Sequence, residues 1–201
     1  MVEKIVIASR NRDKAREIRK ILGNTELKVL TLDDYRGIPN VVEDGKTFEH
    51  NAAKKARIVS RYTGTLTIAD DSGLEVDFLN GRPGVKSARF AGIGADYKAN
   101  NVKLLRLLQT APPSKRKARF VCVIAIAKEG KLLHIIKGTC RGKIAFSPRG
   151  RKGFGYDPLF IPMGYDRTFS ELGPAIKDRI SHRYRALRKT KTVIKRLLKE
   201  V

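Results

Sequence analysis

Residues 118–140 have the sequence ARFVCVIAIAKEGKLLHIIKGTC, which is the clearest structural signal in the chain. Two runs rich in Val, Ile and Leu flank Glu129-Gly130, and such runs around a short glycine-containing turn are typical of a β-hairpin. We therefore expect paired strands over Ala118–Ala127 and Lys131–Cys140.

Outward from this hairpin, strand and helix patterns alternate along the chain. Further strands are expected at Val2–Ala8, Leu27–Leu32, Leu66–Ala69 and around Leu159–Ile161. Helices are expected at Asp13–Leu22, Thr47–Arg61, Ala95–Leu108 and Ser181–Glu200. Alternating elements indicate an α/β fold, and the hairpin makes the sheet mixed. We predict an elongated mixed β-sheet with flanking helices, which form two lobes around a central cleft in one domain over residues 1–201.

Length and composition exclude several classes of protein. The chain has 201 residues, of which 41% are hydrophobic, so it can bury a core without disulfide or metal cross-links. No stretch has the roughly 18 apolar residues that a membrane-spanning helix needs, and the start MVEKIVIAS resembles a strand more than a signal peptide. Cys122 and Cys140 are not expected to pair across the hairpin, so we expect reduced buried thiols in a cytoplasmic protein.

The charge of the chain is strongly unbalanced. The formal net charge is +23, and residues 112–152 carry 12 basic residues against one acidic residue. Such an excess favours a polyanionic partner, either a nucleic acid or a small phosphorylated substrate. A solvated basic face is the alternative for many of the individual lysines.

Two basic motifs precede expected helices or lie within them. The segment Ser9-Arg10-Asn11-Arg12-Asp13-Lys14 stands where a strand turns into a helix, and unpaired N–H groups at a helix start favour anions. It is a candidate phosphate cradle, although Asn11 as an N-cap and Lys14 as a solvated residue would also explain it. Asn51 and Lys55 lie four residues apart and so share one helix face, where they could also be an ordinary cap and a surface lysine.

Acidic residues follow the strand expected at Leu66–Ala69. In the segment Asp70-Asp71-Ser72-Gly73, successive strand residues point to opposite faces, so only one of the two carboxylates would line a given cleft. Carboxylates there suit Mg²⁺, which binds one or two of them and completes its shell with water and phosphate oxygens. Glu43 could supply a further carboxylate. The competing interpretation is a turn with Gly73 at positive φ.

The last two motifs lie towards the C-terminus. In Gly153-Phe154-Gly155-Tyr156-Asp157-Pro158, two glycines bracket an aromatic residue, which could stack on a flat ligand, or the loop could be a simple tight turn. Lys177, His182 and Arg183 cluster near the start of the last helix, where cations are disfavoured without an anion. They predict an anionic or electron-rich ligand.

Taken in order, these motifs resemble those of the inosine triphosphate pyrophosphatase family, whose members act on non-canonical purine nucleotides. The resemblance extends from Ile5 to Ala186, and it also includes Ser87-Ala88-Arg89-Phe90. It implies an elongated two-lobed α/β fold, a homodimer, and Mg²⁺-dependent hydrolysis of ITP, dITP and XTP to the monophosphate and pyrophosphate. The expected partner is a purine nucleoside triphosphate substrate, nucleic acid is not required, and no membrane is expected.

The resemblance also implies roles for individual residues. Asp71 corresponds to the general base and, with Glu43, to the metal carboxylates. The triphosphate binders correspond to Ser9, Arg10, Asn11, Arg12, Asp13, Lys14, Lys55 and Ser72, and Asn51 is a further substrate-binding candidate. The base pocket and its surroundings correspond to Phe154, Gly155, Tyr156, Asp157, Lys177, His182 and Arg183. Arg10, His50 and Lys152 depart from the residues usual in the family at those positions.

Two other functions remain open from the sequence. A nucleic-acid-binding module would account for the charge of residues 112–152, although not for Asp70-Asp71. A related nucleotide pyrophosphatase with modified pyrimidine or canonical substrates would share the fold.

Overall fold

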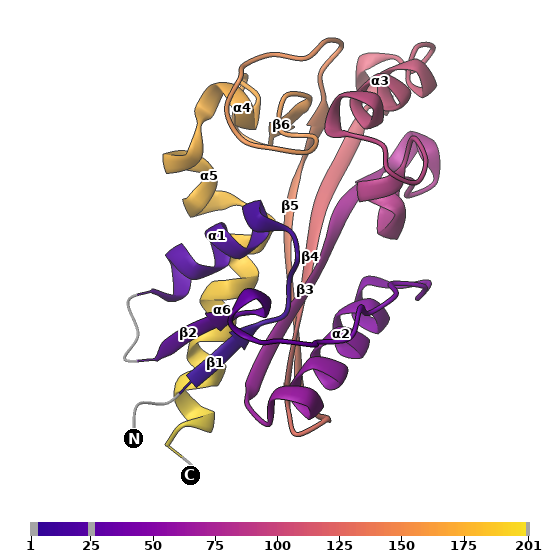
Figure 1. Cartoon of the computed structure of the whole chain (residues 1–201). Coiled ribbons are helices and arrows are strands. Elements are labelled where there is room, and N and C mark those ends of the chain that lie inside the picture. The colour runs from indigo at the N-terminus through magenta and orange to yellow at the C-terminus, as the bar shows by residue number, and fades with distance from the viewer. Residues whose placement is uncertain (1–3, 24–26, 200–201) are drawn as a thin grey trace. The chain divides into compact units, whose positions relative to one another are not determined.

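A computed structural model describes residues 4–23 and 27–199 of the chain (Figure 1). Six strands form one sheet: β1 (Lys4–Ile7), β2 (Lys28–Thr31), β3 (Leu66–Val76), β4 (Lys117–Lys128), β5 (Lys131–Ile144) and β6 (Phe160–Pro162). Their order is β2-β1-β3-β4-β5-β6. β1 is parallel to β2 and β3, whereas β5 and β6 are antiparallel, so the sheet is mixed, as predicted.

Six α-helices accompany the sheet: α1 (Arg12–Leu22), α2 (Phe48–Thr63), α3 (Tyr97–Leu107), α4 (Phe169–Leu172), α5 (Pro174–Ile180) and α6 (His182–Leu197). The predicted α/β class is confirmed. No helix within the described residues is both long and apolar enough to cross a membrane.

The chain divides into two compact units, each with its own core. The first takes the described parts of residues 1–71, 122–138 and 183–201, and the second takes 72–121 and 139–182. Strands β3, β4 and β5 contribute residues to both units.

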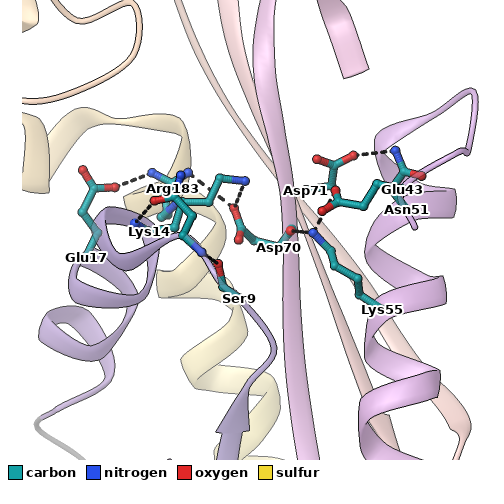
Figure 2. Close-up of polar contacts among 10 residues, drawn as sticks. Ser9, Lys14, Glu17, Glu43, Asn51, Lys55, Asp70, Asp71 and Arg183 are labelled. Carbon is teal, nitrogen blue, oxygen red and sulfur yellow. Dashed lines mark hydrogen bonds and ion pairs between the residues drawn. The ribbon is translucent and has the colours of Figure 1, made fainter. Parts of the chain in front are cut away.

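The first unit is built on a hydrophobic layer between strands and helices. Ile5 and Ile7 of β1 pack in one buried cluster with Ile18 of α1 and with Leu187 and Ile194 of α6. Figure 2 shows α1 and α6 on one side of β3 and α2 on the other. The first two helices each start at a polar capping residue, which is Asn11 for α1 and Thr47 for α2. These caps fix where the helices start relative to the neighbouring strands.

The second unit has an aromatic core. Phe120 of β4 contacts Phe160 of β6 at a ring-centroid distance of 4.6 Å, and Phe160 contacts Phe169 of α4 at 5.3 Å. The edge strand β6 approaches β5 closely at Gly142, where a Cβ atom would collide with Ile161 O. Glycine at position 142 therefore permits the pairing of β5 with β6.

The predicted hairpin is confirmed, with Glu129 and Gly130 at φ 51° and 80° in its turn. Both strands are longer than predicted, and so is β3, which continues through Asp70 and Asp71 to Val76. Gly73 is not at positive φ, so the turn interpretation of this segment is wrong. Cys122 and Cys140 are buried and are not joined in a disulfide, as predicted.

Two short helices were not predicted, although the sequence contains their signals. α4 begins with a capping box between Thr168 and Glu171, and α5 begins with Pro174 at its first turn. Three residues of predicted elements, Val2, Glu3 and Glu200, lie outside the described residues.

Candidate active site

Asp70 and Asp71 lie in the middle of β3 and point to opposite sides of the strand (Figure 2). Both are buried, with 1% and 5% of their surface exposed. The prediction that only one of them lines a given side is confirmed, and each carboxylate has its own set of partners.

The Asp70 carboxylate is held by two cations. Lys14 Nζ lies 3.2 Å and Arg183 Nη2 3.4 Å from Asp70 Oδ2, and Arg183 Nη1 also pairs with Glu17 (Figure 2). Burial alone would raise the pKa of Asp70, but Lys14 and Arg183 hold it well below its ordinary value. Asp70 is therefore an ionised carboxylate that positions cations, and it is a poor proton acceptor.

Lys14 reaches this network because α1 begins where β1 ends. Asn11 Oδ1 accepts a hydrogen bond from Lys14 N at 3.1 Å, so the predicted N-cap role of Asn11 is confirmed. Burial would lower the pKa of Lys14, but the nearby Asp70 carboxylate raises it above its ordinary value. Lys14 is therefore a charged, half-buried ammonium group paired with Asp70, and the solvated-lysine interpretation is wrong.

Asp71 faces α2 on the other side of β3. Asn51 Nδ2 donates to Asp71 Oδ2 at 2.9 Å, and Asn51 Oδ1 accepts from Gly45 N at 2.8 Å (Figure 2). Burial raises the pKa of Asp71 to about 6, while Lys14 and Lys55 oppose this shift and Glu43 adds to it. A carboxyl group with a pKa near 6 is mostly ionised at neutral pH and can still accept a proton.

Lys55 lies beside the two aspartates. Its Nζ atom donates to the backbone oxygen of Asp70 at 2.7 Å and lies 3.0 Å from Glu43 Oε2 (Figure 2). Asn51 and Lys55 are 1% and 9% exposed, so the interpretation of this pair as a cap and a surface lysine is wrong.

The acidic residues on the Asp71 side of β3 suit a divalent cation that takes most of its ligands from water and phosphate oxygens rather than from the protein. No group of three His, Cys, Asp or Glu side chains gathers at one point among residues 4–23 and 27–199. Asp71 and Glu43 nevertheless offer two carboxylates next to Lys55 (Figure 2). Mg²⁺ binds one or two protein carboxylates and takes its other ligands from water and phosphate oxygens, so this donor set fits it.

A second cluster of predicted residues lies within the second unit. Asp157 Oδ2 accepts from Phe154 N at 2.9 Å and lies 2.7 Å from Lys177 Nζ. Lys177 Nζ lies 4.3 Å from the centroid of the Phe154 ring, a cation–π contact. Gly153, at φ 84°, has no room for a Cβ atom beside the Asp157 carboxylate. The loop is thus folded around the Asp157–Lys177 pair.

Two predicted residues of this cluster are part of the core. Tyr156, which the resemblance assigns to the base pocket and its surroundings, is 5% exposed and its hydroxyl donates to Ser87 O at 2.8 Å, so its ring belongs to the core. The His182 ring stacks on Phe120 at a centroid distance of 4.6 Å. For Lys177 and Arg183, carboxylates of the protein itself provide the neighbouring anions.

The remaining predicted residues lie around the start of α1 and in β3. Ser9 Oγ accepts from Asn11 N at 3.3 Å, and the exposed Arg10 donates to Ile38 O at 3.2 Å. Arg12 is exposed and Asp13 lies 3.6 Å from Arg16. The half-buried Ser72 follows Asp71 in β3.

The sequence reasoning missed two residues that contact these clusters. Glu17 pairs with Arg183, and its position one turn after Lys14 on α1 was an available signal. Asn101 Nδ2 donates to Gly155 O at 3.0 Å, and a buried amide in an amphipathic helix was the signal there.

Comparison with known proteins assigns the chain to a family. The model of the Ham1 family matches residues 5–193. The chain belongs to the Ham1 family. The motif resemblance is therefore confirmed over almost the whole chain. The matched range of this Ham1 chain includes the residues of both clusters.

Individual relatives of this Ham1 chain are similar over their full length. A protein from Desulforamulus reducens named dITP/XTP pyrophosphatase is 47% identical over 194 residues, covering 96% of each chain. Another of the same name from Oceanobacillus iheyensis is 46% identical and covers 92% of this chain and 95% of its own. The structure of a HAM1 protein from Coxiella burnetii superposes with a TM-score of 0.88 at 41% identity, covering 98% of this chain and 100% of that one.

Proposed function

We propose that this chain hydrolyses the non-canonical purine nucleotides ITP, dITP and XTP to the nucleoside monophosphate and pyrophosphate, which removes them from the nucleotide pool. The observation that carries the proposal is Asp71, a buried carboxyl whose pKa is raised to about 6 and which Asn51 orients. The names of its relatives, dITP/XTP pyrophosphatases, support the substrate class.

The triphosphate binds at the first cluster in this proposal. Lys14, which is half-buried, and Lys55, which is buried, place two ammonium groups near Asp71, and the start of α1 adds N–H groups with Ser9 and Asn11. Arg10 and Arg12 extend the positive charge at the rim, with Asp13 and Ser72 as neighbouring polar groups. Cations in a water-poor site stabilise the charge that builds up on the phosphates during transfer.

Asp71 acts on the attacking water. Its carboxylate accepts a proton while the water oxygen forms a bond to the α-phosphorus. The bond from that phosphorus to the oxygen bridging the α- and β-phosphates breaks, and its electron pair leaves with pyrophosphate. The proton then passes from Asp71 to solvent. Asp70 takes no part in this transfer. Lys14 and Arg183 lower its pKa, which makes its carboxylate a poor proton acceptor.

Mg²⁺ is the proposed cofactor, with Asp71 and Glu43 as its protein ligands. When bound it would neutralise phosphate charge and polarise the phosphate that is attacked. The lysines of the first cluster share the same task, so their removal and the removal of Mg²⁺ should both weaken substrate binding.

The purine base is assigned to the second cluster. The Phe154 ring offers a stacking surface, and the Asp157–Lys177 pair with Gly155 provides polar groups beside it. Donors that meet a 6-oxo group would be left unpaired by a 6-amino group, which disfavours adenine. Tyr156 and His182 support this loop from the core. Arg183 is the remaining proposed substrate contact, and to reach the substrate it has to leave its carboxylate partners.

Three further properties belong to the proposal. The resemblance supports a homodimer and a single functional domain made of the two units. A cytoplasmic location agrees with two buried cysteines that are not joined in a disulfide and with the nucleotide substrate.

A substrate panel tests the proposed function. Pyrophosphate release is measured with ITP, dITP, XTP, dATP, dGTP and a modified pyrimidine triphosphate, with Mg²⁺ and after chelation. We expect release from the three non-canonical purines only, and only with the metal. Comparable rates with the canonical or pyrimidine nucleotides would favour the related pyrophosphatase instead.

A further inference from the structure

A pocket of about 600 Å³ lies in the second unit, and none of its lining residues belongs to either cluster described above. One wall comes from the exposed positions of β4 and β5. Lys117 and Arg119 alternate with the buried Ala118 on β4, and Arg141 and Lys143 lie two apart on β5. The backbone bond from Ile144 N to Arg116 O (2.9 Å) joins the ends of these two strands.

The charge of this wall is poorly compensated by the protein. Arg119 Nε pairs with Glu75 at 2.5 Å. The side chains of Lys117, Arg141 and Lys143 form no hydrogen bond or ion pair with any residue that the structure describes. Asp77 is the one acidic residue that lines the pocket. With Arg119 paired to Glu75, three further cations against the one lining carboxylate, Asp77, make the pocket complementary to an anion.

The side of the pocket beyond β5 is apolar, because β6 pairs with β5 there. It is formed by β6 and the turn after it, where Met163 is 74% and Tyr165 38% exposed. An exposed aromatic ring next to cations is the arrangement on which bases of a single-stranded nucleic acid stack while their phosphates pair with the cations.

The spacing of the cations distinguishes an extended ligand from a compact one. Residues two apart on a strand are separated by roughly 6.5 Å, so the four cations form rows along β4 and β5. In the first cluster, by contrast, Lys14 and Lys55 converge on one pair of carboxylates. Rows of exposed cations suit phosphates that follow one another along a chain.

We propose that this pocket binds single-stranded nucleic acid, with the cations of β4 and β5 on its phosphates and Tyr165 against a base. The binding is separate from nucleotide hydrolysis and does not depend on the proposed function. It gives a role to part of the basic excess of residues 112–152, of which Lys117, Arg119, Arg141 and Lys143 are members.

The test is fluorescence anisotropy of the full chain with a labelled single strand of roughly 12 nucleotides, titrated at several salt concentrations. The pocket variant combines Lys117→Gln, Arg141→Gln and Lys143→Gln. The matched control combines Lys86→Gln, Lys98→Gln and Arg106→Gln, which removes two lysines and one arginine from exposed positions of the same unit.

We expect the pocket variant to bind at least about tenfold more weakly and to reduce the slope of log K against log salt by about two. Tyr165→Ala should weaken binding by roughly fivefold or more, through lost stacking. In the control variant, the changes in affinity and in slope relative to the parent should each be no more than about a third of the changes seen in the pocket variant. Hydrolysis of dITP should be unchanged in all three, which also shows that they fold.

Four outcomes would overturn the inference. Equal losses in the pocket and control variants would mean that binding follows net charge alone. Equal affinity for a duplex of the same sequence, or full competition by dAMP at equal nucleotide concentration, would exclude a single-strand site. A parent dimer that the pocket variant converts to a monomer, without strand binding by either, would make this face a contact between copies.

Discussion

Asn51 donates a hydrogen bond to the Asp71 carboxylate at 2.9 Å and is itself fixed by the backbone of Gly45. This pair connects α2 to the middle of β3 and sets the orientation of the proposed base. A Cβ atom at Gly45 would lie 2.6 Å from Asn51 Oδ1, so the close approach depends on glycine. The geometry of the site therefore depends on Asn51, which does not itself exchange a proton.

The Asn51–Asp71 contact predicts a shift in the pH profile. In the parent, kcat/KM for dITP should fall below about pH 6, because the pKa of Asp71 is raised to about 6. The hydrogen bond from Asn51 favours the ionised form, so Asn51→Leu should move this acid limb to higher pH and lower kcat about tenfold. Thr47→Val removes the cap of the same helix without touching Asp71 and should leave the limb in place. An unmoved limb in Asn51→Leu would assign Asn51 to folding only.

The buried position of Lys55 predicts a loss of substrate binding. Lys55→Met should raise KM for dITP by about tenfold or more, because one of two ammonium groups near the phosphates is lost. Lys54→Met is the matched control, since the neighbouring Lys54 pairs with the exposed Asp44 at 2.7 Å. Steady-state kinetics of both variants decide the point. Similar KM values for the two would remove Lys55 from the phosphate site.

Asp70 predicts a stability effect. Asp70→Asn removes the carboxylate partner of Lys14 and leaves Arg183 with Glu17 alone, which should cost roughly 3 kcal/mol or more. For a chain of this size we expect Tm to fall by about 6–12 °C. The exposed Asp166→Asn change should leave Tm nearly constant. An unaltered Tm in Asp70→Asn, measured by thermal unfolding, would show that the network adds no net stability.

The lowered pKa of Asp70 also gives a pH dependence of stability. Its folded-state pKa lies below the unfolded value near 4, so its contribution is complete above about pH 4. The contribution is lost as the pH falls further, towards the folded-state pKa. Denaturant unfolding of the parent and Asp70→Asn should therefore differ most near neutral pH and converge in acid. A constant difference at every pH would contradict the ionised state of Asp70.

The Asp157–Lys177 pair predicts a change in substrate selection. Lys177→Met removes a donor and the cation over the Phe154 ring, so kcat/KM for dITP should fall about tenfold and its ratio to dATP should decrease. Arg179→Met changes an exposed cation on the same helix and serves as the control. A fall in rate with an unaltered dITP-to-dATP ratio would give Lys177 a role outside base recognition.

The local pattern of the sequence predicted much of the fold. The two apolar runs and the turn residues Glu129-Gly130 located the hairpin. Capping residues such as Asn11 and Thr47 located the starts of two helices. Asp70-Asp71-Ser72-Gly73 was harder, because these residue types favour turns when they stand alone. They continue a strand here because Lys14, Asn51 and Arg183, which are distant in sequence, satisfy the two carboxylates.

The candidate site was likewise predicted in part. Residue types and the family resemblance identified most members of both clusters, but burial and pairing depend on tertiary contacts. Tyr156 illustrates this limit, since the sequence places an aromatic in a glycine-rich loop while the fold turns its ring into the core. Glu17 shows the reverse, because an ordinary helix glutamate becomes the partner of a buried arginine.

The most direct test of the account is pyrophosphate release from dITP by Asp71→Asn beside Asp44→Asn, an exposed aspartate near the same helix. Asparagine keeps the size of the side chain and the site for a hydrogen bond but cannot accept the proton of the attacking water. We predict that kcat falls at least about 100-fold in Asp71→Asn and stays at the parent value in Asp44→Asn. Release at the parent rate by Asp71→Asn would contradict the assignment of Asp71 as the base.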